Sequence, residues 1–302
     1  MTPVVSIIIP TYNREKDLKR ALNSVLAQTF SGWQAIVVDN HSSDNTEDLV
    51  SSFNDSRIKL FKIHNEGVIA MSRNLGIKHA EGKYIAFLDS DDWWMPNKLE
   101  VSLQYLERGA DLVYHNLFIV TKLHQKFFWR IAPTRHLKSP IFDDLIINGN
   151  TLNNSSVVVR KHLLDKVNGL SEDVEVVGWE DYDVWLKISN LSENFKKIPQ
   201  TLGYYWRVGG NTANPPLRLR CYAAIEKRYA DAISDLSEYH IYWLNYNKGL
   251  QYYLLENYEM AKKYFGLVCL NKVPLYICVS VCRFLLLIKC ATINNFIKQS
   301  FK

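Results

Sequence analysis

The sequence lacks the paired cysteine and histidine spacing of a zinc site, and it has little cysteine of any kind. Its five cysteines all lie in the last third of the 302 residues, four of them in apolar sequence. Thiols without such spacing are typical of a reducing compartment. Residues 1–7 have no basic segment and too short an apolar run for a secretory signal. We therefore expect a cytoplasmic protein.

The sequence also lacks the two glycine-rich loops by which many proteins bind phosphate. No Gly-x-Gly-x-x-Gly follows an apolar run, and no Gly-Lys-Ser/Thr loop is present. A phosphate-bearing ligand must therefore be held by side chains or by a metal ion.

Acidic residues are missing from the end of the chain. No Asp or Glu follows Glu259, whereas seven cations do: Lys262, Lys263, Lys272, Arg283, Lys289, Lys298 and Lys302. The net charge of +5 comes from this tail, and the rest of the chain is nearly neutral. Because a nucleic-acid-binding body would carry a basic face, we expect no nucleic-acid partner.

Apolar runs and helical repeats alternate along the first 120 residues. The apolar runs predict strands at 4–9, 33–38, 58–63, 84–88 and 112–120. Apolar residues at helical spacing predict helices at 16–27, 68–79 and 97–106, and Asp44 and Glu47 predict a capping pair for a helix through Phe53. This alternation is typical of an α/β fold with a mostly parallel sheet covered by helices. With 47% hydrophobic residues, the chain can form one large domain or a domain with an appendage.

Three of the predicted strands end in polar clusters, at residues 10–14, 39–43 and 89–92. The carboxyl ends of parallel strands lie at the same edge of a sheet, where ligands bind in open α/β folds. We therefore expect the three clusters to line one nucleotide-sized crevice.

The strongest single signal is the apolar run 84–88, which ends in three carboxylates within four positions, at Asp89, Asp91 and Asp92. Crowded carboxylates repel one another and persist where a cation neutralises them. Oxygen ligands suit Mg²⁺ or Mn²⁺ better than zinc. A metal-assisted reaction on a phosphate-bearing substrate is the first hypothesis. The alternative is a solvated turn that caps the next helix.

Several segments, in this order, resemble motifs of the family 2 inverting glycosyltransferases of GT-A fold. They are VSIIIPTYNR at 5–14, IVVDN at 36–40 with SSDNT at 42–46, SRNLG at 72–76, FLDSDD at 87–92, SSVVVR at 155–160 and GWEDYDVWL at 178–186. The resemblance covers roughly residues 4–210. It implies a GT-A (Rossmann-like) catalytic domain at 1–215, with a nucleotide-binding half at about 1–120 and an acceptor half at about 121–215, followed by a helical region at 216–302.

The resemblance further implies a UDP-sugar donor and an Mn²⁺ or Mg²⁺ cofactor. The implied donor-binding residues are Pro10, Thr11, Tyr12, Asn13, Arg14, Asp39, Arg73, Asp89 and Ser90. Tyr12 would stack on the base, Asp39 would accept its imide hydrogen, and Arg73 would reach the base or the diphosphate. From the residues alone, Tyr12 is also compatible with a turn, Asp39 with a helix cap and Arg73 with a solvated helix charge.

By the same resemblance, Asp91 is the direct metal ligand, and Asp89 contacts the ribose or the metal shell. Asp92 would support the ligands or cap a helix. Relatives often carry a histidine just beyond Arg207, but here Val208 follows, so no third protein ligand is expected. Gly209 and Gly210 are candidate hinges of a lid.

An inverting transfer needs a general base for the acceptor hydroxyl. The resemblance places it at Asp181, with Glu180 as the competing candidate, and it places Trp179 and Arg207 on the acceptor side. Apolar residues at 184, 188 and 191 predict that a helix begins near Asp181, so helix capping is an alternative role for this carboxylate. Trp179 is either a stacking face for a sugar or a core aromatic.

The last third of the chain predicts helices. Residues 242–265 resemble a helical hairpin, and the apolar run 273–288 is too short to cross a bilayer. This run predicts either an interfacial helix flanked by cations or a buried core helix. Peripheral membrane contact would suit the lipid-linked acceptors that the resemblance implies, above all a polyprenyl-diphosphate-linked sugar in bacterial O-antigen or capsule synthesis. Other oligosaccharide acceptors stay open, and β-glucosyl or β-galactosyl transfer is favoured.

Two other functions compete with this hypothesis. A nucleotidyltransferase would share the strand-end carboxylates but would need a glycine-rich triphosphate loop after the first strand, and residues 10–13 are not one. A non-catalytic glycan-binding module would need neither Asp91 nor Asp181. The loop 122–138, which mixes cations with Phe127, Phe128 and Trp129, is a candidate contact for an acceptor diphosphate or a solvated loop.

Overall fold

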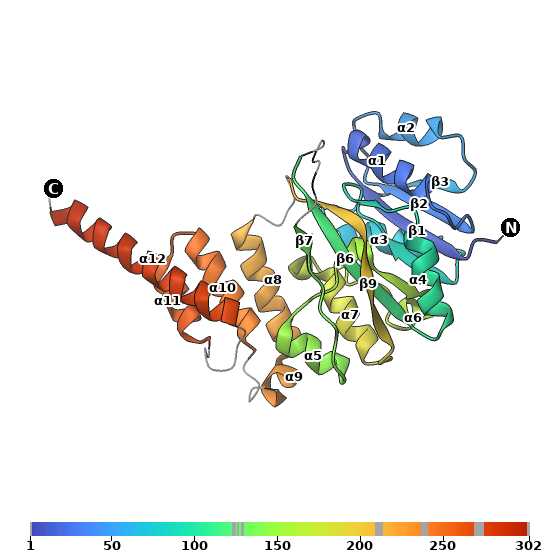
Figure 1. Cartoon of the computed structure of the whole chain (residues 1–302). Helices are drawn as coiled ribbons and strands as arrows, with labels where there is room; N and C mark the ends of the chain where they lie inside the picture. Colours follow the sequence, from blue (N-terminus) through green and yellow to red (C-terminus); the bar gives the residue numbers. More distant parts are fainter. Residues whose placement is uncertain are drawn as a thin grey trace. The chain divides into compact units, whose positions relative to one another are not determined.

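The computed structural model in Figure 1 describes residues 2–122, 125, 127, 130–208, 214–236, 241–268 and 275–300. The chain forms two compact units. One, here called the sheet unit, comprises Met1–Phe142 and Asn150–Gly210, and the other, the helical unit, comprises Asp143–Gly149 and Asn211–Lys302. The boundary after Gly210 lies close to the predicted domain boundary at 215. The lid hinge predicted at Gly209 and Gly210 and the aromatic residues Phe128 and Trp129 lie outside the described residues.

The first half of the sheet unit is a parallel sheet. Its strands are β1 (Val5–Thr11), β2 (Trp33–Asp39), β3 (Ile58–Lys62) and β4 (Tyr84–Phe87), in the order β3-β2-β1-β4. Every residue of β1 and β2 is buried. Continuous burial is expected of parallel strands that helices cover on both faces. The strands therefore begin and end close to where the apolar runs predicted.

The second half of the sheet is mixed. The short strand β8 (Val158–Arg160) lies antiparallel between β4 and β6 (Leu112–Val120). Beyond β6, β9 (Phe195–Trp206) runs parallel to β6, β5 (Trp93–Trp94) pairs antiparallel with β9, and β7 (Ile131–Ala132) pairs with β6. The sheet as a whole is the α/β arrangement that the sequence predicted, with antiparallel pairs confined to this half.

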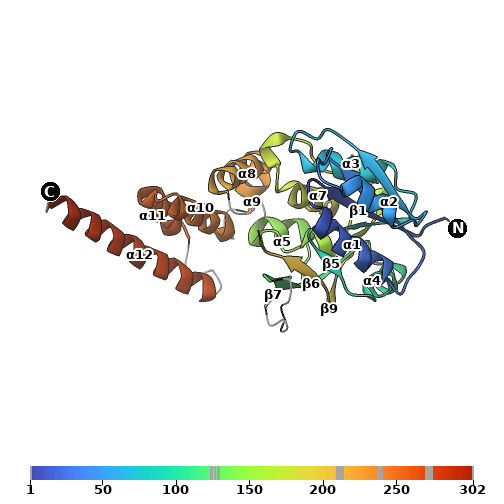
Figure 2. The same cartoon turned by 90° about the horizontal axis from the view of Figure 1, so that it is seen from above.

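Helices cover both faces of the sheet (Figure 2). One face packs on α1 (Glu15–Leu26), α2 (Thr46–Ser52) and α4 (Lys98–Glu107), which share a core with the inward side chains of β1, β2 and β4. The other face packs on α3 (Ile69–Lys78) and α7 (Glu180–Ser189). Gly76 lets α3 approach closely, because a Cβ at that position would lie 2.6 Å from the side chain of Ile8. Between these elements lie α6 (Lys161–Lys166) and two short 3₁₀ turns, η1 (Asn154–Ser156) and η2 (Val174–Val176).

The predicted capping pair of α2 does not form. Asp44 accepts hydrogen bonds from the backbone N–H and hydroxyl of Thr46 and from the backbone N–H of Glu15, so it joins the starts of α1 and α2. Glu47 instead pairs with Lys62 of β3. The pairing was wrong because the cation of a neighbouring strand competes for the Glu47 carboxylate.

The helical unit contains α8 (Pro215–Arg228), α9 (Ala230–Asp235), α10 (Tyr242–Leu254), α11 (Tyr258–Gly266) and α12 (Leu275–Ser300), and it takes in most of α5 (Ile141–Asn148). The predicted helical segment 242–265 is a hairpin of α10 and α11. Glu256 adopts a left-handed backbone conformation at the turn, and the side chain of Asn257 caps α11 by accepting from the backbone N–H of Met260. In the described part of the chain, no helix has both the length and the apolar character needed to span a bilayer.

Candidate active site

The first two polar clusters meet at the carboxyl ends of β1 and β2. Thr11 of β1 is paired with Asp39 of β2. The backbone N–H of Asn13 donates to the Ser42 hydroxyl at 2.8 Å, and the Asn13 side chain accepts from the backbone N–H of Ser43 at 2.7 Å. Pro10 lies in the strand opposite Val38. The two clusters therefore form one edge, as their positions after parallel strands predicted.

Asp39 and Tyr12 differ in their environment at this edge. The Asp39 carboxylate is buried and accepts hydrogen bonds from the backbone N–H and hydroxyl of Ser42. It does not cap α2, which begins at Thr46 after Asn45, so that alternative role for Asp39 was wrong. The Tyr12 ring is 56% exposed, and the Thr11 hydroxyl is buried with no hydrogen-bond partner among the residues described. The edge thus offers a free aromatic face beside a buried carboxylate.

The third cluster lies beside the first. Asp91 accepts from the Arg14 guanidinium at 2.7 Å, and Arg20 donates to the backbone carbonyl of Asp91 at 2.7 Å. Arg20 also lies over the ring of Trp93, 4.3 Å from its centroid. Hydrogen bonds between residues 29 and 77 positions apart in the sequence therefore link all three strand-end clusters at one edge of the sheet.

The carboxylates of this cluster are not those of a solvated turn. Asp92 and Ser90 are buried, and Asp92 accepts from the backbone N–H of Trp206 at 2.9 Å. The helix that follows is preceded by Asn97, so Asp92 does not cap it. Burial, aided by the charges of Asp91 and Asp89, raises the pKa of Asp92 well above its usual value. Both alternatives for this segment, a solvated turn and a cap by Asp92, are contradicted.

The environment of Asp91 also opposes the ionisation of its carboxyl group. Burial raises the pKa of Asp91 to about 6, the charge of Asp89 adds to the rise, and Arg14 opposes it. Two hard carboxylates that repel each other form a donor set that suits a divalent cation completed by substrate phosphates, as Mg²⁺ sites often are. Within the described ranges, no group of three or more Asp, Glu, His or Cys residues is arranged to hold a metal.

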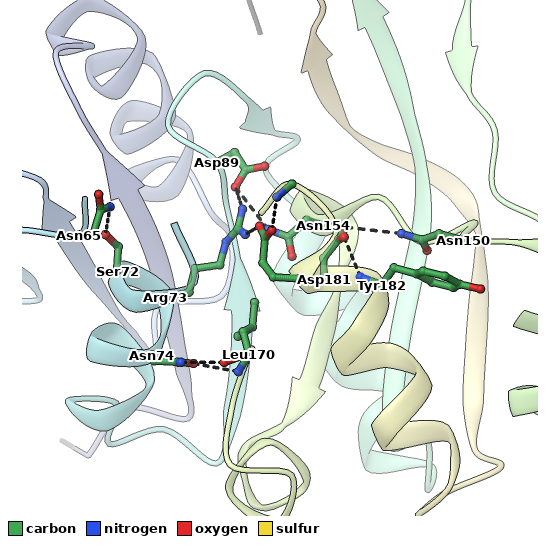
Figure 3. Close-up of polar contacts among 12 residues, drawn as sticks. Asn65, Ser72, Arg73, Asn74, Asp89, Asn150, Asn154, Leu170, Asp181 and Tyr182 are labelled. Atoms are coloured by element: carbon green, nitrogen blue, oxygen red, sulfur yellow. Dashed lines mark hydrogen bonds and ion pairs between the residues drawn. The ribbon is translucent and has the colours of Figure 1, made fainter. Parts of the chain in front are cut away.

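Arg73 joins the strand-end cluster to α7 (Figure 3). It is 4% exposed, and its guanidinium donates to Asp89 at 2.7 Å and pairs with Glu180. Burial by itself would lower the pKa of Arg73, but Asp89 and Glu180 outweigh it and raise the pKa. The alternative of a solvated helix charge was therefore wrong. Asp89 is further held by Ser155, whose hydroxyl accepts from the Asp89 backbone N–H, and by the Asn154 side chain at 3.3 Å.

Glu180 and Asp181 begin α7, but their environments are different. Glu180 is buried; one oxygen is paired with Arg73 and the other accepts from the backbone N–H of Gly178 at 2.6 Å. Asp181 is partly accessible; it accepts from the backbone N–H of Tyr182 at 2.7 Å and lies 3.5 Å from the Asn150 amide nitrogen. Burial raises the pKa of Asp181 to about 7, Glu180 adds to the rise, and Arg73 opposes it. Of the two carboxylates, Asp181 is the one without an ion pair to Arg73 and with the weaker hydrogen bonds to its oxygens.

The remaining predicted residues lie around this network. Trp179 precedes α7, is half-buried, and packs edge-on against Tyr182. Arg207 follows β9; its backbone N–H donates to Val120, and its side chain is exposed. Asp183, on the same helix as Glu180 and Asp181, is fully buried and pairs with Lys187 at 2.7 Å.

Sequence reasoning missed Asn150, Asn154 and Arg20. Asn154 lies just before a quoted motif, and both asparagines belong to the asparagine-rich stretch 148–154. That enrichment was the only local signal for them. Arg20 had none, because it lies nearly two helical turns beyond the polar cluster, among residues that otherwise predict a plain surface helix.

The comparisons with known proteins agree with this geometry. A family model described as Glycosyl transferase family 2 matches residues 6–159. The Escherichia coli protein named UDP-Glc:alpha-D-GlcNAc-diphosphoundecaprenol beta-1,3-glucosyltransferase WfgD is 36% identical over 188 residues, which are 61% of this chain and 69% of that protein. WfaP of Escherichia coli, with the same description, is 32% identical over 215 residues, 70% of this chain and 80% of that protein.

A solved structure shows the same fold. The crystal structure of S. aureus TarS 1-349 in complex with UDP-GlcNAc superposes with a TM-score of 0.62 at 20% identity, covering 88% of this chain and 82% of that chain. The family match removes the nucleotidyltransferase alternative. The chain is a member of glycosyl transferase family 2, a glycosyltransferase of the GT-A fold.

Proposed function

We propose that the protein transfers a hexose from a UDP-sugar to a hydroxyl of a polyprenyl-diphosphate-linked sugar, with inversion at the anomeric carbon. The donor and acceptor classes are those in the names of WfgD and WfaP, which are glucosyltransferases for GlcNAc-diphosphoundecaprenol. Transfer of β-glucose or β-galactose to an N-acetylhexosamine, in bacterial O-antigen or capsule synthesis, is the specific form that we propose.

The observation that carries this proposal is the buried network of Arg73. Arg73 holds Asp89, at the strand edge that would bind the donor, and Glu180, at the start of the helix that presents Asp181. A transferase must fix the anomeric carbon of its donor relative to the group that activates the acceptor. A fully desolvated guanidinium between two carboxylates is a rigid link of this kind.

Asp181 is the proposed general base. The acceptor hydroxyl gives its proton to the Asp181 carboxylate while its oxygen forms a bond to the anomeric carbon, and the bond from that carbon to the UDP oxygen breaks with its electron pair on UDP. A base with a pKa near 7 is well matched to neutral pH. Asn150 and the backbone N–H of Tyr182 orient the carboxylate. Glu180 is a positioning residue, because both of its oxygens are already engaged.

The strand edge supplies the proposed donor site. Tyr12 offers an exposed side chain on which the uracil would stack, and the buried Asp39 carboxylate would accept the imide hydrogen of the base. Asp91, with Asp89, would hold Mn²⁺ or Mg²⁺, and such an ion would stabilise the negative charge that develops on the leaving diphosphate. The Arg14 guanidinium, now paired with Asp91, supplies a second positive charge beside the same phosphates.

A carboxylate-to-amide exchange at Asp181 tests the proposal. Asp181→Asn is expected to lower acceptor-dependent UDP release about 10²–10⁴-fold, the usual contribution of a general base, while UDP still binds. The control is Asp165→Asn, at an exposed carboxylate of α6 that pairs with Lys161, and it should leave the turnover number within about threefold of the wild-type value. Proton NMR of the product should show a β-linkage. An α-linked product, or full activity of Asp181→Asn, would reject the proposed mechanism.

A further inference from the structure

Helix α12 carries apolar side chains on two opposite faces. The inner face is buried: Ile277, Val281 and Ile288 belong to a hydrophobic cluster with Ala261 and Phe265 of α11. In Figures 1 and 2, α12 accordingly runs beside the α10–α11 pair. This packing accounts for the apolar residues at positions 277, 281 and 288, which recur at helical spacing.

The outer face of α12 is apolar as well, but it is exposed. Leu275, Val279, Leu286 and Leu287 are 79%, 61%, 65% and 41% exposed. Cys278, Cys282 and Arg283 lie beside Val279, Leu286 and Leu287 on the same open surface of the helix. Contiguous exposed apolar surface of this kind marks an interaction site far more often than scattered single residues do.

Every charged residue of α12 is a cation. Arg283 lies on the outer face, and Lys289 is exposed further along the helix. No Asp or Glu follows Glu259 in the sequence. A partner of this face should therefore combine an apolar interior with an anionic surface.

A second copy of the chain does not meet that requirement. A two-fold interface through the outer face would bring its cations against the same cations of the partner, and α12 has no carboxylate to neutralise them. An anionic bilayer does meet it, because acyl chains would receive the leucines and lipid phosphates would receive Arg283 and Lys289.

We propose that the outer face of α12 (Leu275, Val279, Cys282, Arg283, Leu286 and Leu287) lies in the interfacial layer of an anionic membrane. The helix binds on the surface rather than across it, since no described helix is apolar and long enough to span. The inference rests on the proposed function in one respect: membrane binding would bring the enzyme to an acceptor that is carried by a membrane lipid.

Vesicle flotation tests the inference with the full-length protein. We expect binding to vesicles of phosphatidylglycerol and phosphatidylethanolamine in equal parts, weak binding to phosphatidylcholine alone, and loss of binding as salt is raised. Leu286→Glu and Val279→Glu should each lower the vesicle partition coefficient at least about tenfold. Leu191→Glu makes the same exchange at an exposed leucine of the sheet unit and should bind as the wild type does.

Three results would overturn the inference. The first is that the wild-type protein does not float with anionic vesicles, and the second is that Leu191→Glu weakens binding as much as Leu286→Glu, which would reveal a mere net-charge effect. The third is a wild-type dimer that Leu286→Glu converts to monomers with no change in vesicle binding. Circular dichroism and melting curves confirm that the variants are folded. The vesicles contain neither donor nor acceptor, so their result is independent of whether the protein transfers sugar.

Discussion

The two units of the chain depart in opposite ways from the usual distribution of side chains. The sheet unit buries charge: Arg73 and Glu180 are both about 4% exposed. The helical unit exposes apolar surface: Leu275 and Leu286 of α12 are 79% and 65% exposed. Buried charges and exposed apolar patches are the two observations that point most directly to function, because neither improves the stability of an isolated chain.

The difference suggests that the two units bind different kinds of partner. In the sheet unit Asp91 is paired with Arg14, yet burial and repulsion between carboxylates raise the pKa of both Asp91 and Asp181. A bound cation would relieve the repulsion between these carboxylates. In the helical unit the apolar side chains on the inner face of α12 are buried, whereas those on its outer face are exposed. An apolar partner would cover that outer face. The substitutions that follow test ligand binding and transfer by the sheet unit and membrane binding by the helical unit, from the largest expected effect to the smallest.

Loss of the Asp91 carboxylate should have the largest effect. Asp91→Ala removes the proposed metal ligand and leaves Arg14 without this partner, so we expect transfer to fall about 10³-fold, as expected when metal stabilisation of several kcal/mol is lost. Calorimetry should show that Mn²⁺ no longer strengthens UDP binding. The control Asp111→Asn alters a carboxylate that pairs with Arg160 away from this edge and should keep the metal effect. Metal-dependent binding of UDP by Asp91→Ala would contradict the assignment.

Removal of the Tyr12 ring should weaken donor binding more than catalysis. Stacking of a base on an aromatic side chain contributes about 1–3 kcal/mol, so Tyr12→Ala should raise the KM for the UDP-sugar at least about fivefold with little change in kcat. Tyr12→Phe keeps the flat ring and should resemble the wild-type enzyme. An unchanged KM in Tyr12→Ala would show that the exposed ring does not contact the donor.

The membrane face should matter only for acceptors held in a bilayer. Leu286→Glu is expected to lower transfer to a polyprenyl-linked acceptor in anionic vesicles by several-fold, because less enzyme is bound to them. Transfer to a short-chain soluble analogue should be unaffected. If both acceptors lose activity equally, the substitution acts on the fold of the enzyme and not on membrane binding.

Neutralisation of Glu180 should shift the pH dependence of transfer. Glu180 raises the pKa of Asp181, so Glu180→Gln lowers that pKa and keeps the base deprotonated at lower pH. The acidic limb of the kcat profile should therefore move to lower pH. Glu172→Gln, on an exposed carboxylate that accepts from Asn74, should leave the limb in place. A limb that moves to higher pH in Glu180→Gln would contradict the proposed electrostatic relation.

The smallest expected effect is one of stability. Because the pKa of Asp181 is raised to about 7 in the folded protein from a usual 3.8, its ionisation costs stability as pH rises through this range. Asp181→Asn should therefore raise the melting temperature above pH 7, and the gain should shrink as pH falls toward 4. A variant that melts lower than the wild type at pH 8 would show that the carboxylate is a structural cap rather than a destabilising functional group.

Local patterns in the sequence predicted most of the sheet edge. The apolar runs before Thr11, Asp39 and Asp89 end within a residue or two of the observed strands, because continuous burial in a parallel sheet leaves a direct mark on the sequence. The start of α7 at Glu180 followed from helical spacing in the same way. The motifs then supplied the family, which the comparisons show independently.

Long-range pairing could not be predicted. Arg73 and Glu180 are 107 positions apart, and nothing near either residue indicates the other. The buried position of the Asp92 carboxylate depends on β9, because it accepts a hydrogen bond from the backbone N–H of Trp206. For α12, the sequence left open a core helix or an interfacial helix. Its two apolar faces explain why, since a helix that is apolar on both its buried and its exposed side shows no clear periodicity in its apolar residues.

The most direct test of the central claim is the pH dependence of a single turnover, with UDP-sugar bound in advance and acceptor in excess. The wild-type rate constant should rise with pH and level off with an apparent pKa near 7, the value to which burial raises Asp181. The residual rate of Asp181→Asn should lack this rise. A wild-type rate constant that does not change between pH 5 and 9, or an Asp181→Asn variant with the same profile, would contradict the account.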